Sequence, residues 1–102
     1  MQNISSFQNI TIMYTIDFSG TGTMTLNNFT QDQQKQILYV LNNVVSKYDA
    51  QTPDITKVRY LGDGFYAIKI NHSIRVMAKI QDNIFNIIDV FTHTRSQSLA
   101  AA

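Results

Sequence analysis

The sequence predicts an α+β fold in which an N-terminal strand or hairpin and one core helix precede a four-stranded antiparallel meander. Three observations lead to this prediction. Large apolar residues alternate with a period of two near the N-terminus, recur at intervals of three and four in the middle of the chain, and alternate again in four short runs of the second half. Because 102 residues with 44% apolar content supply one modest core, we expect a single domain over residues 1–102.

The first predicted element is a strand from Ile10 to Phe18. Every second position of this segment carries a large β-branched or aromatic side chain, which is typical of a half-buried strand. The segment 19–22, Ser-Gly-Thr-Gly, should then end the strand. Residues 23–26 are expected to return as a short second strand, which would complete a hairpin.

The second predicted element is a helix over residues 31–48. Thr30 and, three residues later, Gln33 form the signature of a capping box, and Asp32 lies in the first turn, where a negative charge is favoured. Pro53 marks the connector that follows, because proline does not continue a helix. Apolar residues recur along one stripe, which should be buried: Ile37, Leu38, Leu41, Val44, Val45 and Tyr48.

The rest of the chain predicts four strands, at residues 57–61, 65–70, 74–80 and 84–91. The gaps between them are about three residues long, as in tight antiparallel hairpins, so sequential neighbours should pair. In the third strand we expect one face to pack on the helix, with Ile74, Val76, Ala78 and Ile80. The opposite face then carries Arg75, Met77 and Lys79. Residues 96–102 are expected to form a disordered tail.

Charge is divided unequally along the chain. Residues 1–54 carry two lysines and four aspartates, a net charge of −2, whereas residues 55–102 carry six lysines and arginines and three aspartates, a net charge of +3. A basic half is typical of a face that binds a polyanion or an acidic partner, although an ordinary solvated surface gives the same asymmetry. All seven acidic residues are aspartates, so the chain has no glutamate to act as a general base.

Several classes of protein are not supported by the sequence. The chain has no cysteine, which excludes disulfides and thiolate ligands and fits the cytoplasm. No segment approaches the roughly 20 apolar residues of a membrane-spanning helix, so we expect a soluble protein without membrane partners. The chain also lacks a glycine-rich phosphate loop, a nucleophile elbow and a cluster with metal-ligand spacing, so neither a metal nor another cofactor is expected.

The candidate functional residues are the basic side chains on the meander strands and at their exits. Residues two apart on a strand point the same way, so Phe91 and His93 should share a face. Cations that bind phosphate oxygens beside an aromatic ring are the parts of a site for single-stranded RNA. Alternating cations also keep the solvent side of a sheet soluble, and that reading stays open. The candidates are Lys57, Arg59, Lys69, Arg75, Lys79, His93 and Arg95.

Three runs in this half resemble the C-terminal meander of the RelE/ParE toxin superfamily: LGDGFYAIKI, SIRVMAKI and NIFNIIDVFTHTR. In that family a Gly-aromatic strand start precedes an arginine that opens the next strand, and a D/N-rich turn, an aliphatic strand and a terminal F/Y-x-H/K motif follow. The resemblance covers roughly residues 55–95 and implies a RelE-like, microbial-RNase-like fold.

The resemblance also implies roles for single residues. Arg75 matches the strand-borne catalytic arginine of the family, and His93 lies where ribosome-dependent members have a C-terminal histidine or lysine. In those members the 2′-OH of mRNA in the ribosomal A site attacks the neighbouring phosphate. Arginine suits the charge of the phosphorane, and histidine suits proton transfer. The remaining cations are implied to contact RNA: Lys57, Arg59, Lys69, Lys79 and Arg95.

The function implied by the resemblance is that of the toxin of a toxin–antitoxin pair, a ribosome-dependent mRNA endoribonuclease that inhibits translation. Its partners would be a cognate antitoxin, bound as a hetero-oligomer, together with the ribosome and mRNA. The alternative is a non-catalytic binding module, such as a ParE-like gyrase inhibitor or an inactive relative. The chain departs from the family in its single predicted helix where a two-helix hairpin is usual, in its lack of glutamate, and in Thr94, where some members have a catalytic tyrosine.

Overall fold

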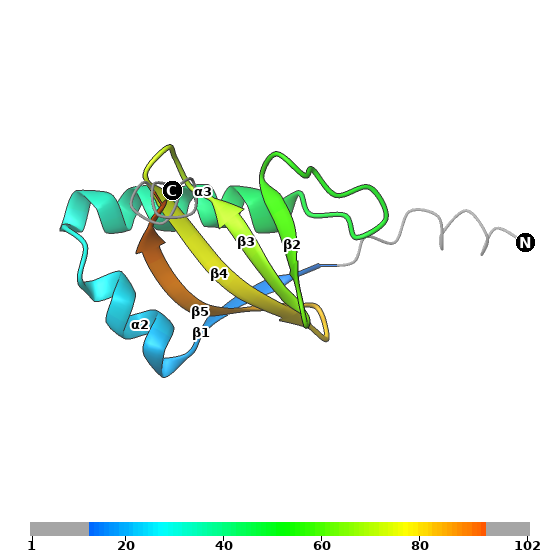
Figure 1. The fold of residues 1–102 in the computed structure, drawn as a ribbon, viewed down its shortest axis with the longest axis horizontal. Coiled ribbons are helices and arrows are strands. Elements are labelled where there is room, and N and C mark those ends of the chain that lie inside the picture. The colour runs from blue at the N-terminus through cyan, green and yellow to red at the C-terminus, as the bar shows by residue number, and fades with distance from the viewer. Residues whose placement is uncertain (1–12, 94–102) are drawn as a thin grey trace, which may run out of the picture.

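The computed structural model describes residues 13–93, and within them the chain forms two helices and five strands (Figure 1). The predicted tail at 96–102, the candidate Arg95 and the start of the predicted first strand lie outside the described residues. In chain order the elements are β1 (Thr15–Phe18), α2 (Gly20–Asn27), α3 (Gln31–Ser46), β2 (Val58–Gly62), β3 (Phe65–Lys69), β4 (Ile74–Gln81) and β5 (Ile84–Thr92). The α+β class is confirmed.

The five strands form one mixed sheet in the order β1-β5-β4-β3-β2. Strands β2 to β5 pair antiparallel with their sequential neighbours, so the predicted four-stranded meander is confirmed. Strand β1 pairs parallel with β5, from Thr15 opposite Ile84 to Phe18 opposite Ile87. The first strand therefore joins the sheet beside the last one, with both helices in the connection between β1 and β2.

The predicted return strand over residues 23–26 is wrong, because this segment is part of helix α2. Ser19 caps the helix, since its Oγ accepts a hydrogen bond from the backbone N of Gly22 at 3.0 Å. Thr23 and Thr25 donate their hydroxyls to carbonyls one turn earlier, at 3.0 Å each, so these side chains are satisfied within the helix. Residues 13–93 thus contain two consecutive helices, and the prediction of a single helix is corrected as well.

Close contact with β5 explains why a helix forms from this glycine- and threonine-rich segment. Gly22 is buried, and a Cβ at this position would lie 2.2 Å from the carbonyl oxygen of Ile87. The Oγ of Ser19 donates to that same oxygen at 2.9 Å. Glycine lets the helix backbone approach the strand, and the contact stabilises a helix that its own propensity would not favour.

Helix α3 begins where the capping signature predicts. Thr30 Oγ1 accepts from the backbone N of Gln33 at 3.1 Å, and Gln33 Oε1 accepts from the backbone N of Thr30 at 3.0 Å. The helix ends at Ser46, two residues before the predicted end. Its buried stripe is narrower than predicted, with Ile37, Leu41 and Val45.

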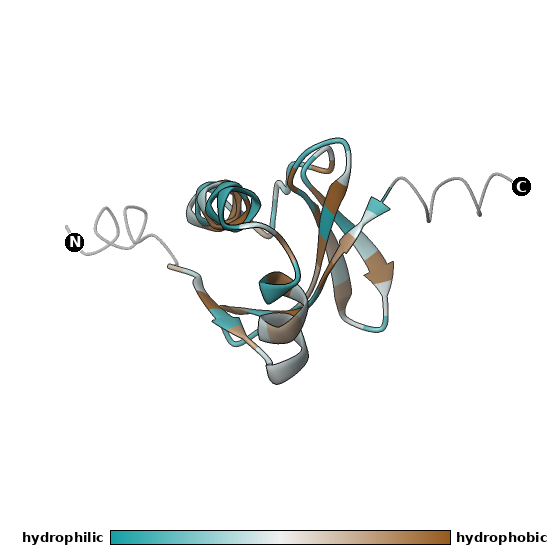
Figure 2. Ribbon diagram, turned by 90° about the vertical axis from the view of Figure 1, so that its left-hand side faces the viewer, coloured by the Kyte–Doolittle hydropathy of each residue, from teal (hydrophilic) through white to brown (hydrophobic). Residues whose placement is uncertain are grey.

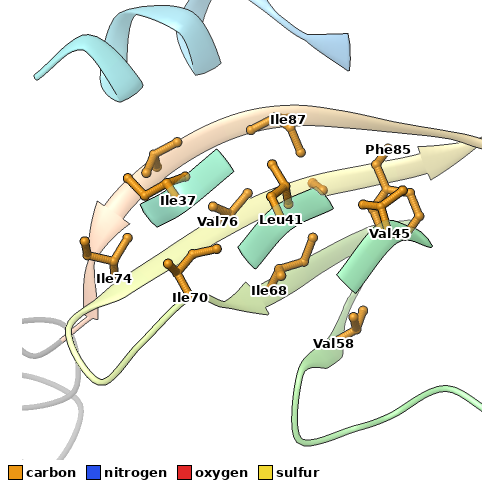
Figure 3. Close-up of a cluster of buried hydrophobic side chains, with 12 residues drawn as sticks. Ile37, Leu41, Val45, Val58, Ile68, Ile70, Ile74, Val76, Phe85 and Ile87 are labelled. Carbon is orange, nitrogen blue, oxygen red and sulfur yellow. The ribbon is translucent and has the colours of Figure 1, made fainter. Parts of the chain in front are cut away.

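The core lies between α3 and one face of the sheet (Figure 3). The predicted inner face of β4 is confirmed, because Ile74, Val76 and Ala78 are buried and Ile80 packs against them. Leu26 of α2 packs against this same cluster, so both helices cover one face. Figure 2 shows α3 lying across one side of the strongly twisted sheet. The other face of the sheet carries no helix from the described residues, and this is the face of interest for function.

Candidate functional site

Arg75 lies at the centre of a row of side chains across the helix-free face. In the strand register it stands opposite Lys69 of β3 on one side and Phe91 of β5 on the other. Directly opposed residues on neighbouring strands have Cβ atoms about 4.5–5.5 Å apart, so the three side chains are neighbours. The row places a guanidinium between an ammonium group and an aromatic ring.

A pocket of about 280 Å³ opens over this row, and we call it the basic pocket. The structure brings five of the seven predicted site residues together in its lining: Lys57, Arg59, Lys69, Arg75 and His93. The other lining residues are Ile55, Thr56, Leu61, Ala67 and Phe91. None of the ten is acidic, so no lining carboxylate neutralises the cations, and an anionic ligand is the complementary one.

A bulge in β5 decides that Phe91 and His93 face this pocket. Phe85 and Ile87 point into the core, so strict alternation would turn Phe91 and His93 inward as well. Met77 pairs with Asp89 and Ala78 pairs with Ile87, which leaves Ile88 as an extra residue. The alternation therefore shifts by one residue: Val90 is buried, and both candidate residues line the basic pocket on the opposite face.

Helix α2 supports this bulge from the other face of the sheet. The backbone N of Val90, which follows the bulge, donates a hydrogen bond to Thr25 Oγ1 at 2.9 Å. A buried N–H without an acceptor would be costly, so Thr25 stabilises the irregular strand. Sequence reasoning predicted that Phe91 and His93 share a face, but it predicted neither the bulge nor this contact.

Lys79 does not belong to the basic pocket. It lies four residues along β4 from Arg75, which is about 13 Å on an extended strand. Its Nζ is 5.5 Å from the centroid of the Phe65 ring, a cation–π contact. It also lines a separate pocket of about 210 Å³ with Asp17 and Asp82. Arg95, the remaining candidate, lies outside the described residues.

Sequence reasoning missed the residues that fix the guanidinium of Arg75. Its Nη1 donates to the carbonyl oxygens of Asn71 and of Ile74, the latter at 3.2 Å. The signal for this arrangement was the Asn-His-Ser turn, because asparagine commonly closes such turns with its side chain. His72 is exposed in the turn and lines none of the pockets described here.

The described residues contain no metal centre of the ordinary kind. Between residues 13 and 93, no three histidine, cysteine or acidic side chains come close enough to hold an ion together. In the same part of the chain, no helix is both long and apolar enough to cross a membrane.

Comparison with known proteins assigns the fold. No protein-family model matches the chain, and no curated protein matches it in sequence. Among solved structures, it resembles the toxin–antitoxin complex RelBE2 from Mycobacterium tuberculosis at 15% identity and a TM-score of 0.65, covering 79% of this chain and 99% of that one. It also resembles a mutant of the Escherichia coli toxin RelE in the free state, at 19% identity and a TM-score of 0.62, covering 86% of this chain and 92% of that one. The YoeB–YefM complex from Staphylococcus aureus is similar at 24% identity and a TM-score of 0.58, covering 76% of this chain and 94% of that one.

The chain therefore has the fold of the RelE-like toxins, as the resemblance of its meander implied. Similarity at identities below 25% establishes the fold, and the activity has to be argued from the basic pocket. The two consecutive helices remove one of the three departures from the family, because α2 and α3 stand where the family usually has two helices.

Proposed function

We propose that this protein is the toxin of a toxin–antitoxin pair and acts as a ribosome-dependent mRNA endoribonuclease that inhibits translation. The observation that carries the proposal is the convergence of Arg75, Phe91 and His93 in one pocket with three further cations. The similar solved structures include the toxin RelE and two toxin–antitoxin complexes, which supports the same class.

The chemistry we propose is an attack of the RNA 2′-OH on the adjacent phosphorus. A bond forms between the 2′ oxygen and phosphorus, and the bond from phosphorus to the 5′ oxygen breaks, which leaves a cyclic 2′,3′-phosphate and a 5′-OH. Arg75 binds the non-bridging oxygens and stabilises the phosphorane charge with its planar fork. His93 transfers one of the two protons, either from the 2′-OH or to the departing 5′ oxygen. No step requires a metal ion.

The other lining residues fit a single-stranded substrate. Lys57, Arg59 and Lys69 provide positive charge along the path of the backbone, and Phe91 offers a ring on which a base can stack. The nucleic acid has to be single-stranded here, because a base inside a duplex is not free to stack on a side chain. Messenger RNA held on the ribosome meets this requirement, and this target places the protein in the cytoplasm.

The proposed antitoxin covers the basic pocket. Its lining combines four lysines and arginines with three large apolar side chains, those of Ile55, Leu61 and Phe91. A partner segment with both carboxylates and apolar side chains therefore complements it. RelBE2 was solved as a toxin–antitoxin complex, and so was YoeB–YefM, which supports our inference of a hetero-oligomer here.

A test of this function compares induced wild-type protein with Arg75→Ala, His93→Ala and the double variant in a bacterial host. The wild type should stop growth and protein synthesis and create new mRNA 5′ ends within translated codons. The double variant should be harmless. Lys79→Ala is the matched control, because it removes a cation from the same strand outside the basic pocket, and it should stay toxic. Undiminished toxicity of the double variant would remove both residues from the mechanism.

A second candidate is a non-catalytic binding module, such as a ParE-like gyrase inhibitor or an inactive relative. One observation favours it: the lining of the basic pocket contains one histidine, His93, and no carboxylate, although cleavage requires both a base and an acid. Transcript mapping separates the two candidates. A DNA-damage response without new mRNA 5′ ends would indicate the gyrase target.

A further inference from the structure

The turn between β3 and β4 is closed by the side chain of Asn71. Its Oδ1 accepts hydrogen bonds from the backbone N of Ser73 and from that of Ile74, both at 2.8 Å. An asparagine that bonds to the backbone two and three residues ahead fixes the local path of the chain. Asn71 therefore determines how the chain enters β4, where Arg75 is the second residue.

The backbone of this turn also holds both candidate catalytic residues. The carbonyl oxygen of Asn71 accepts from Nη1 of Arg75. The carbonyl oxygen of Ser73 accepts from the backbone N of His93. One three-residue turn thus sets the direction of the guanidinium and the position of the histidine relative to each other.

The hydrogen bonds of Arg75 leave its phosphate-binding edge available. A guanidinium has five N–H donors, two of them on Nη1. Both side-chain hydrogen bonds that Arg75 makes within residues 13–93 leave from Nη1, toward the carbonyl oxygens of Asn71 and Ile74. The N–H groups on Nε and Nη2 remain, and this edge can bind two phosphate oxygens at once.

A further hydrogen bond connects the turn to the helical layer. Asn71 Nδ2 donates to Oε1 of Gln36 on α3 at 3.1 Å. The polar group of Asn71 thus has partners on both sides: its oxygen closes the turn, and its nitrogen contacts the helix. The loop that carries the guanidinium contact is fixed to a regular element rather than to solvent alone.

We propose that Asn71 is a positioning residue, which holds the turn so that its carbonyl oxygen orients Arg75 with the Nε and Nη2 edge toward the basic pocket. The proposal rests on the proposed function for the identity of the ligand, an RNA phosphate. The orientation of the guanidinium itself is a property of the free protein and is measurable without RNA.

The test uses the full chain with Asn71→Ala, which removes all three side-chain hydrogen bonds, and Asn71→Asp, which keeps the acceptor that closes the turn. His72→Ala is the matched control, since it changes an exposed residue of the same turn. The readouts are the ¹⁵N heteronuclear NOE of Arg75 Nε in the free protein, and the kcat and KM of mRNA cleavage on programmed ribosomes. Thermal unfolding identifies variants that remain folded.

We expect Asn71→Ala to lower the NOE of Arg75 Nε and to reduce kcat by roughly tenfold to a hundredfold, the size of effect that a small misplacement produces. KM should change by less than kcat, because Lys57, Arg59 and Lys69 still bind the phosphates of the RNA backbone. Asn71→Asp should restore most of both signals, and His72→Ala should match the wild type. If Asn71 only contributed to overall stability, Asn71→Asp, which keeps the acceptor oxygen but loses the donor to Gln36, would not be expected to restore the NOE and kcat selectively.

The possible failures of the two proposals are distinguishable. If wild-type protein cleaves no mRNA, the proposed function fails, and the NOE alone decides whether Asn71 positions Arg75. An unchanged NOE in Asn71→Ala overturns the positioning role, as does a wild-type kcat in a protein that cleaves mRNA. If Asn71→Ala does not fold, Asn71→Ser takes its place, because a shorter side chain has to weaken the turn contact to a measurable degree if the role is correct.

Discussion

At the scale of single residues, the basic pocket centres on the guanidinium of Arg75, which no lining carboxylate neutralises. Charge alone does not account for the role proposed for Arg75, because lysine has the same charge. The planar fork of arginine binds two oxygens in fixed geometry, whereas the ammonium of lysine acts as a point charge. The geometric requirement and the charge requirement can therefore be separated by a conservative substitution.

Arg75→Lys should keep the positive charge of the pocket and lose most of the activity. We expect mRNA cleavage to fall by about a hundredfold or more, comparable to the loss of one preorganised donor to a transition-state oxyanion. Lys69→Arg is the control on the adjacent strand, and it should retain cleavage within a few-fold. Initial rates on programmed ribosomes measure both variants. Equal rates for Arg75→Lys and the wild type would show that only charge matters.

Asp54, in the connector before β2, provides a prediction on pH. The hydroxyl and the backbone N of Thr56 donate to Asp54 Oδ1, the latter at 3.0 Å, and these hydrogen bonds hold the pKa of the carboxyl below its ordinary value. Since the folded pKa is depressed, the stabilisation is present above the unfolded pKa and is lost as pH falls through the folded one. The effect is therefore confined to acid solution below about pH 4.

Thr56→Val removes the hydroxyl donor and should raise the pKa of Asp54 toward its ordinary value. The ¹³C chemical shift of the Asp54 carboxyl, followed from pH 2 to pH 6, measures this change. Thr52→Val is a useful control, because the hydroxyl of Thr52 donates to Asp49 instead. A titration midpoint for Asp54 that is the same in Thr56→Val and wild type would contradict the assignment.

At the scale of elements, the sequence was informative where structure follows from local pattern. The capping box and a six-residue apolar stripe predicted α3, and Ile37, Leu41 and Val45 of that stripe are buried. The short gaps between apolar runs predicted the meander. Helix α2 could not be predicted this way, because its glycines and threonines have low helix propensity and form no apolar stripe. It is stabilised by contacts with β5, about 65 residues further along the chain.

The same distinction applies to the candidate site. The register of the meander strands follows from the turn lengths. The sequence could therefore indicate that Lys69, Arg75 and Phe91 lie on neighbouring strands at the same end of the sheet. The face of β5 that carries His93 was not, because it depends on the extra residue Ile88 at the bulge. A bulge leaves no local signal comparable to a capping box, and this one is supported by a contact with a helix that the pattern did not reveal.

The packing of α2 on β5 predicts opposite effects for two glycines of one helix. Gly22→Ala should destabilise the protein by about 1–3 kcal/mol, because the added Cβ meets the backbone oxygen of Ile87 at 2.2 Å. Gly20→Ala should stabilise it by about 0.5–1 kcal/mol, because nothing lies within 4 Å of that Cβ and alanine favours the helix. Urea denaturation measures both. Equal free energies of unfolding for the two variants would contradict the close packing.

At the scale of the whole molecule, both helices cover one face of the sheet, and no helix of residues 13–93 covers the other. The core side chains of β3, β4 and β5 point toward α3 (Figure 3). The alternate positions of these strands carry cations and Phe91, which line the basic pocket. This division separates the apolar core on one face of the sheet from the basic side chains on the other. It also explains why an acidic half and a basic half occur in one small domain, since most of the basic residues belong to the meander.

The most direct measurement of the central claim is cleavage of mRNA by the purified full chain on programmed ribosomes. The wild type should cut the message at the codon in the A site and leave a 5′-OH end on the downstream fragment, whereas Arg75→Ala with His93→Ala should leave it intact. Lys79→Ala should cut at the wild-type rate. An intact message with wild-type protein, or equal cleavage by the double variant, would contradict the assignment of the basic pocket as an endoribonuclease site.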